Sequence, residues 1–165
     1  MRLTIYTDYS LRLLMYLAVK DDDLATIAEV AESYDISKNH LMKVAHQLGV
    51  AGYIETVRGR SGGLRLAKSP KNINLGEVVR RTEPDMALVP CFKPVEAFCV
   101  IHPSCLLRGA LHRAQAAFVK VLDEYSLSDL VQPRTKLQTL LSIDASSSSP
   151  ARGGEQKKRK ARVGA

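Results

Sequence analysis

The sequence predicts a mainly α-helical protein with a small β-hairpin wing: a winged helix-turn-helix followed by a long dimerisation helix. Three observations support this fold class. Short amphipathic helical patterns surround one Gly-rich hairpin in residues 1–82, and residues 104–131 are strongly helical with a heptad seam over residues 107–125. All three cysteines of the 165 residues lie in or beside the segment that joins these two regions.

Composition narrows the class of protein. With 45% hydrophobic and 25% charged residues and no long apolar run, the chain is typical of a globular protein without a membrane span. The N-terminus lacks the apolar core of a signal peptide, so we expect a cytoplasmic protein with reduced thiols. The net charge of +7 is uneven, because residues 151–165 hold six Lys or Arg and one acid. Residues 37–81 hold nine basic residues against Glu55 and Glu77, an excess that suits a polyanion.

Two amphipathic helices are expected at the start of the chain. The apolar stripe of the first predicts a helix that begins at Thr7 or Asp8 and ends near Lys20. The second opens with Thr26 and has Glu29 three residues later. This is a capping-box pattern, in which each side chain satisfies a backbone amide that the helix leaves free.

A third helix follows closely, and the pair has the spacing of a helix-turn-helix. Ser37 can cap this helix, and Gly52 ends it. Its outward face carries cations and amides, the groups that contact phosphates and base edges. We expect the DNA-binding residues of this helix to be Ser37, Lys38, Asn39, His40 and Lys43. A plain α-hairpin with a solvated outer face is the alternative.

A β-hairpin directly after these helices favours DNA binding. Residues 53–57 have strand character, residues 58–63 form a Gly-rich turn and residues 64–66 alternate as a return strand. In this place a hairpin is a wing, and Arg58 and Arg60 at its tip suit a phosphate or the minor groove. A basic surface hairpin that does not contact DNA is the alternative.

The rest of the chain divides by pattern and composition. A short helix capped by Asn74 ends by Pro84 and closes the DNA-binding domain, and a Pro-containing loop with cysteines follows. From about residue 142 onward the sequence is low-complexity, basic and without periodicity, which is typical of disorder. We therefore expect four parts: a winged helix-turn-helix domain (1–82), a cysteine loop (83–103), a dimerisation helix with a short C-terminal helix (104–141) and a disordered basic tail (142–165).

The long helix is expected to be capped by Ser104 and to end near Tyr125. A helix of about 21 residues spans ~30 Å, and its apolar stripe is more than so small a domain can cover. We infer a homodimer in which the same helix of a second subunit covers the stripe; the alternative is that the N-terminal domain folds back onto it. The stripe has heptad spacing and consists of Leu107, Leu111, Ala114, Phe118, Val121 and Tyr125. Such a dimer suits a palindromic double-stranded DNA operator with half-sites about 34 Å apart.

Cys91, Cys99 and Cys105 have the spacing Cys-x7-Cys-x5-Cys. The tight Cys pairs of structural zinc sites and of thioredoxin-like proteins are absent from the sequence. Wide spacing suits an iron–sulfur cluster bound by thiolates, and the start of the long helix favours the thiolate form of Cys105. A zinc site and unligated cysteines are the alternatives. An enzyme is disfavoured, since no catalytic grouping and no phosphate-binding motif is found.

Five stretches, taken together, point to one family. They are MRLTIYTDYSLRLLMYLA, VRGRSGGLRLAK, LGEVVRRTEP, VPCFKPVEAFCVIHPSCLLRGAL and DEYSLSDLV. They resemble the Rrf-two family of winged-helix iron–sulfur regulators, and the last two most resemble its nitric-oxide-sensing repressors. The resemblance covers residues 1–141 and implies that Cys91, Cys99 and Cys105 bind an iron–sulfur cluster, of the 4Fe–4S type or else 2Fe–2S.

The resemblance also implies a fourth ligand. In the nitric-oxide-sensing branch this ligand can be an aspartate from the first helix of the other subunit, which Asp8 matches here. Arg12, one turn on, could hold that carboxylate by a charge-assisted bond. An ordinary first-turn acid is the alternative for Asp8. Another branch has a ligand histidine three residues after the third cysteine, where this chain has Arg108; His102 could bind metal but fits a loop histidine better.

The implied function is a dimeric DNA-binding transcriptional repressor that senses nitric oxide through its cluster. One alternative is an iron-responsive or cluster-status regulator of the same family. The other is a zinc- or thiol-containing interaction protein that does not bind DNA. No membrane partner is expected, and the basic tail could add non-specific attraction to DNA.

Overall fold

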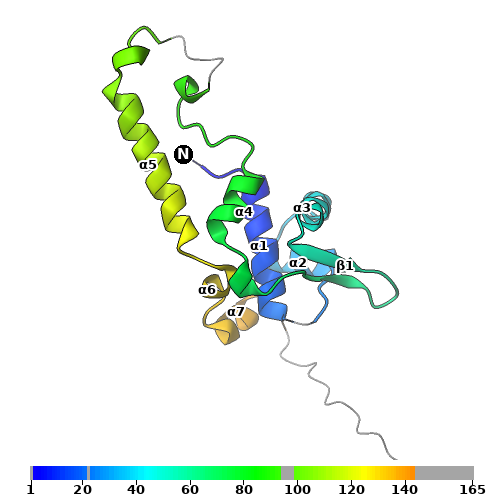
Figure 1. The fold of residues 1–165 in the computed structure, drawn as a ribbon. Helices are drawn as coiled ribbons and strands as arrows, with labels where there is room; N and C mark the ends of the chain where they lie inside the picture. Colours follow the sequence, from blue (N-terminus) through cyan, green and yellow to red (C-terminus); the bar gives the residue numbers. More distant parts are fainter. Residues whose placement is uncertain (1, 22, 94–98, 144–165) are drawn as a thin grey trace, which may run out of the picture.

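A computed structural model describes residues 2–21, 23–93 and 99–143, so the basic tail expected from the sequence lies almost wholly outside the described residues. The described part is mainly helical and holds one β-hairpin (Figure 1). Its helices and strands are α1 (Ile5–Lys20), α2 (Ile27–Tyr34), α3 (Lys38–Val50), β1 (Ile54–Val57), β2 (Gly63–Leu66), α4 (Leu75–Thr82), α5 (Leu106–Asp123), α6 (Leu127–Leu130) and α7 (Arg134–Leu140). Short 3-10 turns, η1 (Pro70–Asn72), η2 (Pro90–Phe92) and η3 (His102–Ser104), join them.

Helix α1 lies at the centre of the fold (Figure 1). It begins at Ile5, so the start expected at Thr7 or Asp8 was wrong. The physical reason is the cap, because the Thr4 side chain accepts a hydrogen bond from the Thr7 amide and the helix starts directly after Thr4. The predicted end at Lys20 is confirmed.

The helix-turn-helix forms from α2 and α3. The predicted capping box is present, with Thr26 and Glu29 each binding the other's backbone amide. Asp35 then ends α2 in the left-handed region at φ 51°, which aspartate tolerates better than most residues. Ser37 is the N-cap residue of α3, although its side chain makes no capping bond. Gly52, at φ 73°, lies just beyond the end of α3 as expected.

The wing is an antiparallel pair of short strands. Ile54 lies opposite Leu66 and Val57 opposite Gly63, which agrees with the predicted hairpin. The outer edge of β2 is also bound, since Leu64 and Ala25 exchange backbone hydrogen bonds of 2.8 and 3.0 Å. Gly63 permits this approach, because a Cβ atom there would lie 2.9 Å from the Ala25 carbonyl oxygen.

Helix α4 joins the core to the long helix. Asn74 caps α4 as predicted, accepting from the Glu77 amide at 3.0 Å. Its amide group also donates to the Asp123 carbonyl oxygen at 2.7 Å, at the far end of α5. Arg80 completes the junction with two hydrogen bonds to the Asp123 carboxylate, at 3.0 and 2.8 Å. The C-terminal end of α5 is therefore fixed to α4.

Helix α5 extends away from the core (Figure 1). The structure describes all of α5, and none of its residues is buried. Its expected start was wrong, because Ser104 lies in η3 and Cys105 is the N-cap residue. It ends at Asp123, short of the predicted Tyr125, and Tyr125 is 46% exposed.

Two short helices, α6 and α7, return to α1, where the sequence predicts one. Leu127, Val131 and Leu141 are buried in the same core as the leucines of α1. Arg134 ties α7 to the end of α1 by donating to the Val19 carbonyl oxygen at 2.9 Å. No helix in the described ranges is both long and apolar enough to cross a membrane.

Candidate DNA-binding surface and cysteine site

The outward face of α3 lies free on the surface. Its inward stripe is buried and consists of Leu41, Val44, Ala45 and Leu48. The residues predicted to bind DNA are all exposed: Ser37, Lys38, Asn39, His40 and Lys43. Most form the first two turns of α3, the end at which recognition helices usually contact base edges. The His40 ring lies 6.2 Å from that of Tyr9 on α1, so its side chain also rests against the core helix.

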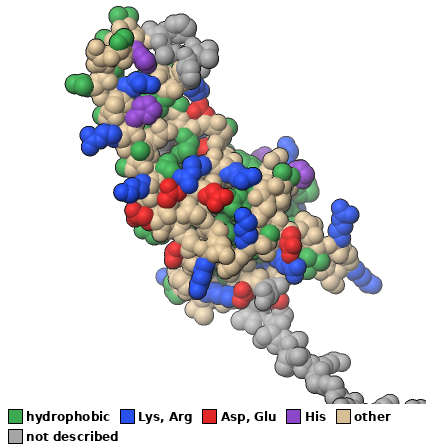
Figure 2. Space-filling view, in the orientation of Figure 1, with side chains coloured by type: hydrophobic (Ala, Val, Ile, Leu, Met, Phe, Trp, Pro, Cys, Tyr) green, Lys and Arg blue, Asp and Glu red, His purple; other side chains and the backbone are tan. Residues whose placement is uncertain are grey.

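The wing tip adds positive charge beside α3. Arg58 and Arg60 are exposed there, and Figure 2 shows Lys and Arg side chains at the end of the hairpin. Gly59, between them, has φ 124°, a conformation that glycine adopts readily. Arg65 instead pairs with Glu55 across the strands, so the body of the wing is closer to neutral than its tip. Wing and α3 lie on the opposite side of α1 from α5 (Figure 1).

The three cysteines are free thiols that lie on either side of residues 94–98. Cys91 is half-buried in η2, Cys99 is exposed, and Cys105 is half-buried at the start of α5. His102 is half-buried in η3, and its backbone amide donates to the Cys99 carbonyl oxygen. Within the described residues of one chain, no three His, Cys, Asp or Glu side chains are close enough to hold a metal ion.

Cys105 is the N-cap of α5, and its Sγ accepts from the Arg108 backbone amide at 3.4 Å. The sulfur of Cys105 is thus held at the positive end of the α5 dipole, and a deprotonated cysteine sulfur is the form that binds metal. Thiolates are also the usual protein ligands of iron–sulfur clusters. The chemistry of the donor set therefore fits such a cluster, although one chain offers three thiols and needs a fourth donor.

The carboxylate of Asp8 is held in a fixed orientation. Arg12 donates from Nε to Oδ1 at 3.0 Å and pairs through Nη2 with Oδ2 at 3.0 Å, so the one-turn pairing predicted from the sequence is present. The Arg12 guanidinium also lies 5.8 Å from the ring centre of Tyr34. Each carboxylate oxygen keeps a lone pair beyond its bond to Arg12, so Asp8 can still act as a ligand.

Two contacts that the sequence did not indicate hold the cysteine loop against α5, and a third lies within the loop. The Phe92 ring stacks on the His112 ring with centroids 3.9 Å apart and planes 11° apart. Gln115 donates to the Met86 carbonyl oxygen at 2.5 Å, which fixes the loop one turn further along α5. Within the loop, Lys93 pairs with Asp85 at 2.7 Å and lowers the pKa of that carboxyl group. Because the partners of the two contacts with α5 lie at least 20 residues apart in sequence, no local pattern could have revealed them.

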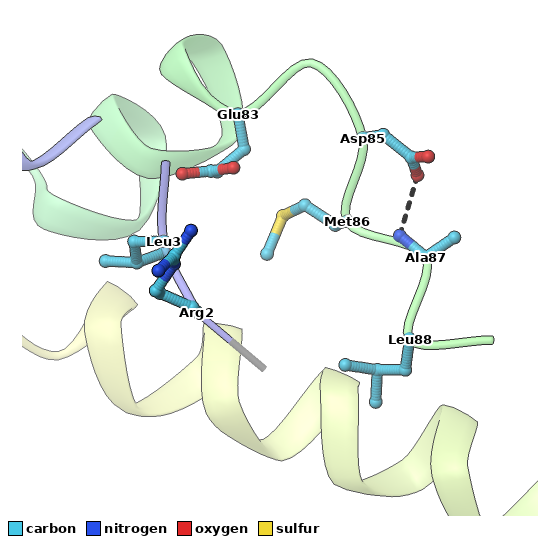
Figure 3. Close-up of a pocket in the computed structure, with 7 residues that line it drawn as sticks. All are labelled: Arg2, Leu3, Glu83, Asp85, Met86, Ala87 and Leu88. Atoms are coloured by element: carbon cyan, nitrogen blue, oxygen red, sulfur yellow. Dashed lines mark hydrogen bonds between the residues drawn. The ribbon is translucent and has the colours of Figure 1, made fainter. Parts of the chain in front are cut away.

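The start of the same loop is bound to the N-terminus of α1. Glu83 accepts from the Thr4 amide at 2.8 Å and from its hydroxyl at 3.1 Å. Nearby, the Thr7 hydroxyl donates to the buried Thr82 hydroxyl at 2.9 Å. A cavity of about 160 Å³ lies beside these bonds (Figure 3) and is lined by Arg2, Leu3, Glu83, Asp85, Met86, Ala87 and Leu88. The α1 turn that carries Asp8 is thus linked to the loop that carries Cys91.

Sequence comparison places the chain among transcriptional regulators. The Rrf2 (Rrf-two) family, described as an iron-dependent transcriptional regulator, matches residues 3–133. A protein of Bacillus licheniformis named HTH-type transcriptional regulator NsrR is 50% identical over 143 residues, which are 86% of this chain and 100% of that protein. The protein of the same name from Bacillus subtilis is 51% identical over 144 residues, 87% of this chain and 99% of the relative.

Structural comparison agrees on the fold. CymR, the global cysteine regulator of B. subtilis, superposes with a TM-score of 0.63 at 23% identity, over 79% of this chain and 95% of CymR. IscR of T. potens superposes with a TM-score of 0.66 at 20% identity, over 84% of this chain and 91% of IscR. These likenesses confirm the predicted winged-helix fold class, and the relatives are regulators rather than enzymes. The chain belongs to the Rrf2 family of transcriptional regulators and is NsrR-like within it.

Proposed function

We propose that the chain is a homodimeric transcriptional repressor whose affinity for its DNA operator depends on an iron–sulfur cluster that senses nitric oxide. The observation that carries the proposal is the place of the three free thiols. They lie in the segment between α4 and α5, which is bound to α1 of the DNA-binding domain through Glu83 and to α5 through Phe92. The name NsrR, shared by relatives of about 50% identity over nearly their whole length, supports the same function.

The proposed ligands are Cys91, Cys99, Cys105 and Asp8 of the partner subunit, in a 4Fe–4S or 2Fe–2S site. When bound, the cluster supplies iron that nitric oxide can attack. The three thiolates are soft donors, whereas the Asp8 oxygen is a hard one, so the set is unequal. We expect the carboxylate to be the ligand that is displaced most easily, and Arg12 to hold it in place until then.

Dimerisation through α5 is supported by its uncovered apolar side chains. Two residues of the predicted heptad seam, Leu107 and Val121, are 65% and 51% exposed in the single chain, so the seam is free to contact a second copy. Figure 2 shows hydrophobic side chains exposed at the end of the molecule where α5 begins. A second copy of α5 would cover this stripe and place two α3 helices on the half-sites of a palindromic operator.

The contacts of the loop suggest how loss of the cluster would change the affinity for DNA. Asp8 lies one helical turn from Thr4, and Thr4 is bound to Glu83 at the start of the loop. A cross-subunit bond from Asp8 to the cysteine site would fix α1 of one subunit relative to α5 of the other. Releasing that bond would let the spacing of the two α3 helices change, and operator affinity would fall.

The test measures DNA binding by protein purified without oxygen. A duplex selected from random DNA by that protein serves as the operator, and binding is followed by fluorescence anisotropy. We expect nitric oxide to release the DNA, and Cys99→Ser protein to bind weakly whether or not the gas is present. Equal affinity before and after the gas would overturn nitric oxide sensing.

An iron-responsive regulator of the same family is the second candidate, because the family is described as iron-dependent. The two candidates differ in the agent that releases DNA first. A nitric-oxide sensor should release DNA on exposure to the gas before an iron chelator has any effect. An iron-responsive protein should release DNA with the chelator before it does so with nitric oxide. A colourless protein that contains zinc and does not bind DNA would contradict both.

A further inference from the structure

Arg108, in the first turn of α5, has a buried donor without an acceptor. Its Nε is shielded from solvent and has no hydrogen-bond partner in the described part of the chain. A buried polar group left unpaired costs about 1–3 kcal/mol, and more when it is charged. Its backbone amide, in contrast, is bound to the Cys105 Sγ at 3.4 Å.

Helix stability does not explain an arginine here. The positive end of the helix dipole lies at the N-terminus, so a cation in the first turn is unfavourable, and the first turn of α5 holds no acid to offset it. Three carboxylates of the loop, of α1 and of the far end of α5 already have cationic partners. Asp85 is paired with Lys93, Asp123 with Arg80, and Asp8 with Arg12. The charge of Arg108 therefore lacks a partner among these groups.

We infer that Arg108 is a positioning residue of the cysteine site and donates a hydrogen bond to an anionic sulfur of the assembled cluster. This inference rests on the proposed function. The Arg108 backbone amide contacts the Cys105 sulfur at 3.4 Å, and side chains on a helix lean toward its N-terminus, which is where the cysteine site lies. Three thiolates and a carboxylate bring four negative charges to the site, and a guanidinium beside them offsets one. Arg108 thus supplies a positive charge and a hydrogen-bond donor to the site, although it does not bind the metal itself.

The reduction potential of the cluster is the readout that a purely structural role would not change. Hydrogen bonds to the sulfurs and net charge set this potential. We expect Arg108→Gln to lower it, since the variant loses the positive charge that stabilises the reduced state. Arg108→Lys should recover part of the shift, because lysine keeps the charge but lacks the planar fork of donors. Arg113→Gln, on an exposed site of the same helix, is the matched control and should leave the potential unchanged.

A second measurement uses the protein without its cluster. If Nε has no partner there, Arg108→Gln should unfold at the same temperature as the parent or slightly higher. A lower unfolding temperature combined with an unchanged potential would assign Arg108 a structural role and overturn the inference. Absence of iron from protein purified without oxygen would instead overturn the proposed function itself, so the two failures are distinguishable.

Discussion

The junction between α4 and α5 allows one quantitative prediction, the effect of replacing Gly76 by alanine. Gly76 is buried in the first turn of α4, against Asp123 at the end of α5. A Cβ atom there would overlap the Asp123 Oδ1 and lie 2.8 Å from Cγ and 3.1 Å from the backbone nitrogen of the same residue. The Asp123 side chain would have to move, and its two hydrogen bonds from Arg80 would be lost.

The change in the free energy of unfolding follows from three effects, of which two destabilise the variant and one stabilises it. Overpacking a close contact costs about 1–3 kcal/mol. Losing the exposed Arg80–Asp123 ion pair adds little, because exposed ion pairs are weakened by solvent. Alanine gains at most about 1 kcal/mol over glycine in a helix, and less in a first turn. We therefore expect Gly76→Ala to reduce the free energy of unfolding by about 1–2 kcal/mol, and to lower Tm by about 2–4 °C for each kcal/mol in a chain of this length.

Gly49 provides the matched control. It also lies near a helix end, but a Cβ atom there would meet nothing closer than the Ile54 carbonyl oxygen at 3.9 Å. Gly49→Ala should therefore be neutral or stabilising in urea unfolding. In the Asp123→Ala background, Gly76→Ala should lose most of its cost, since the obstructing carboxylate is gone. If Gly76→Ala is as stable as the parent, or costs the same in both backgrounds, the described packing of α4 on α5 is wrong.

Three further predictions concern DNA binding, the core and pH. If Arg60 contacts a phosphate, Arg60→Ala should reduce the slope of log affinity against log salt concentration by about one unit. Lys68→Ala, which lies beyond the wing tip, is the control and should leave the slope unchanged. An unchanged slope for Arg60→Ala would show that Arg60 does not contact the DNA. Tyr53→Phe should cost less than about 0.5 kcal/mol in urea unfolding, because the buried Tyr53 hydroxyl makes no well-formed hydrogen bond among the described residues. Burial and the nearby Glu77 carboxylate raise the pKa of Tyr53 to about 12, so Glu77 is the candidate acceptor, and a cost above about 1.5 kcal/mol would show that it accepts a hydrogen bond from Tyr53. The hydrogen bond from Arg80 lowers the pKa of Asp123 below its ordinary value of 3.8. The ionised Asp123 therefore stabilises the fold above pH 3.8, and this stabilisation is lost as the pH falls through the lower pKa of the folded state. The difference in unfolding free energy between the parent and Asp123→Asn should shrink over that pH range, and a constant difference would contradict the pairing.

Local patterns were enough to predict much of the DNA-binding part. The capping box at Thr26, the glycine after α3 and the strand pairing of the wing depend on residues close in sequence, and the structure has all three. The start of α1 was missed although its cap, Thr4, is local to Thr7; the contact that holds Thr4 in place comes from Glu83, 79 residues away. No periodicity in a single helix could reveal that contact.

At the cysteine site, too, local sequence patterns predicted the residue types but not all of their contacts. Spacing and resemblance pointed to three cysteine ligands, but Ser104 was expected to cap the long helix because serine is a far commoner cap than cysteine. In the structure the Cys105 sulfur caps α5, so the same residue starts the helix and is a proposed ligand. The Phe92–His112 stack and the unpaired Nε of Arg108 depend on side-chain packing, which the sequence pattern does not encode.

The central claim is that an iron–sulfur cluster keeps the dimer able to bind its operator. The most direct measurement divides one oxygen-free preparation in two, removes the cluster from one half, counts iron and sulfide per chain, and measures operator affinity for both. We predict that the loaded half binds about 5–150-fold more tightly, the range of a typical coupling between two sites. An iron-free preparation that binds the operator as tightly as the loaded one would contradict the claim.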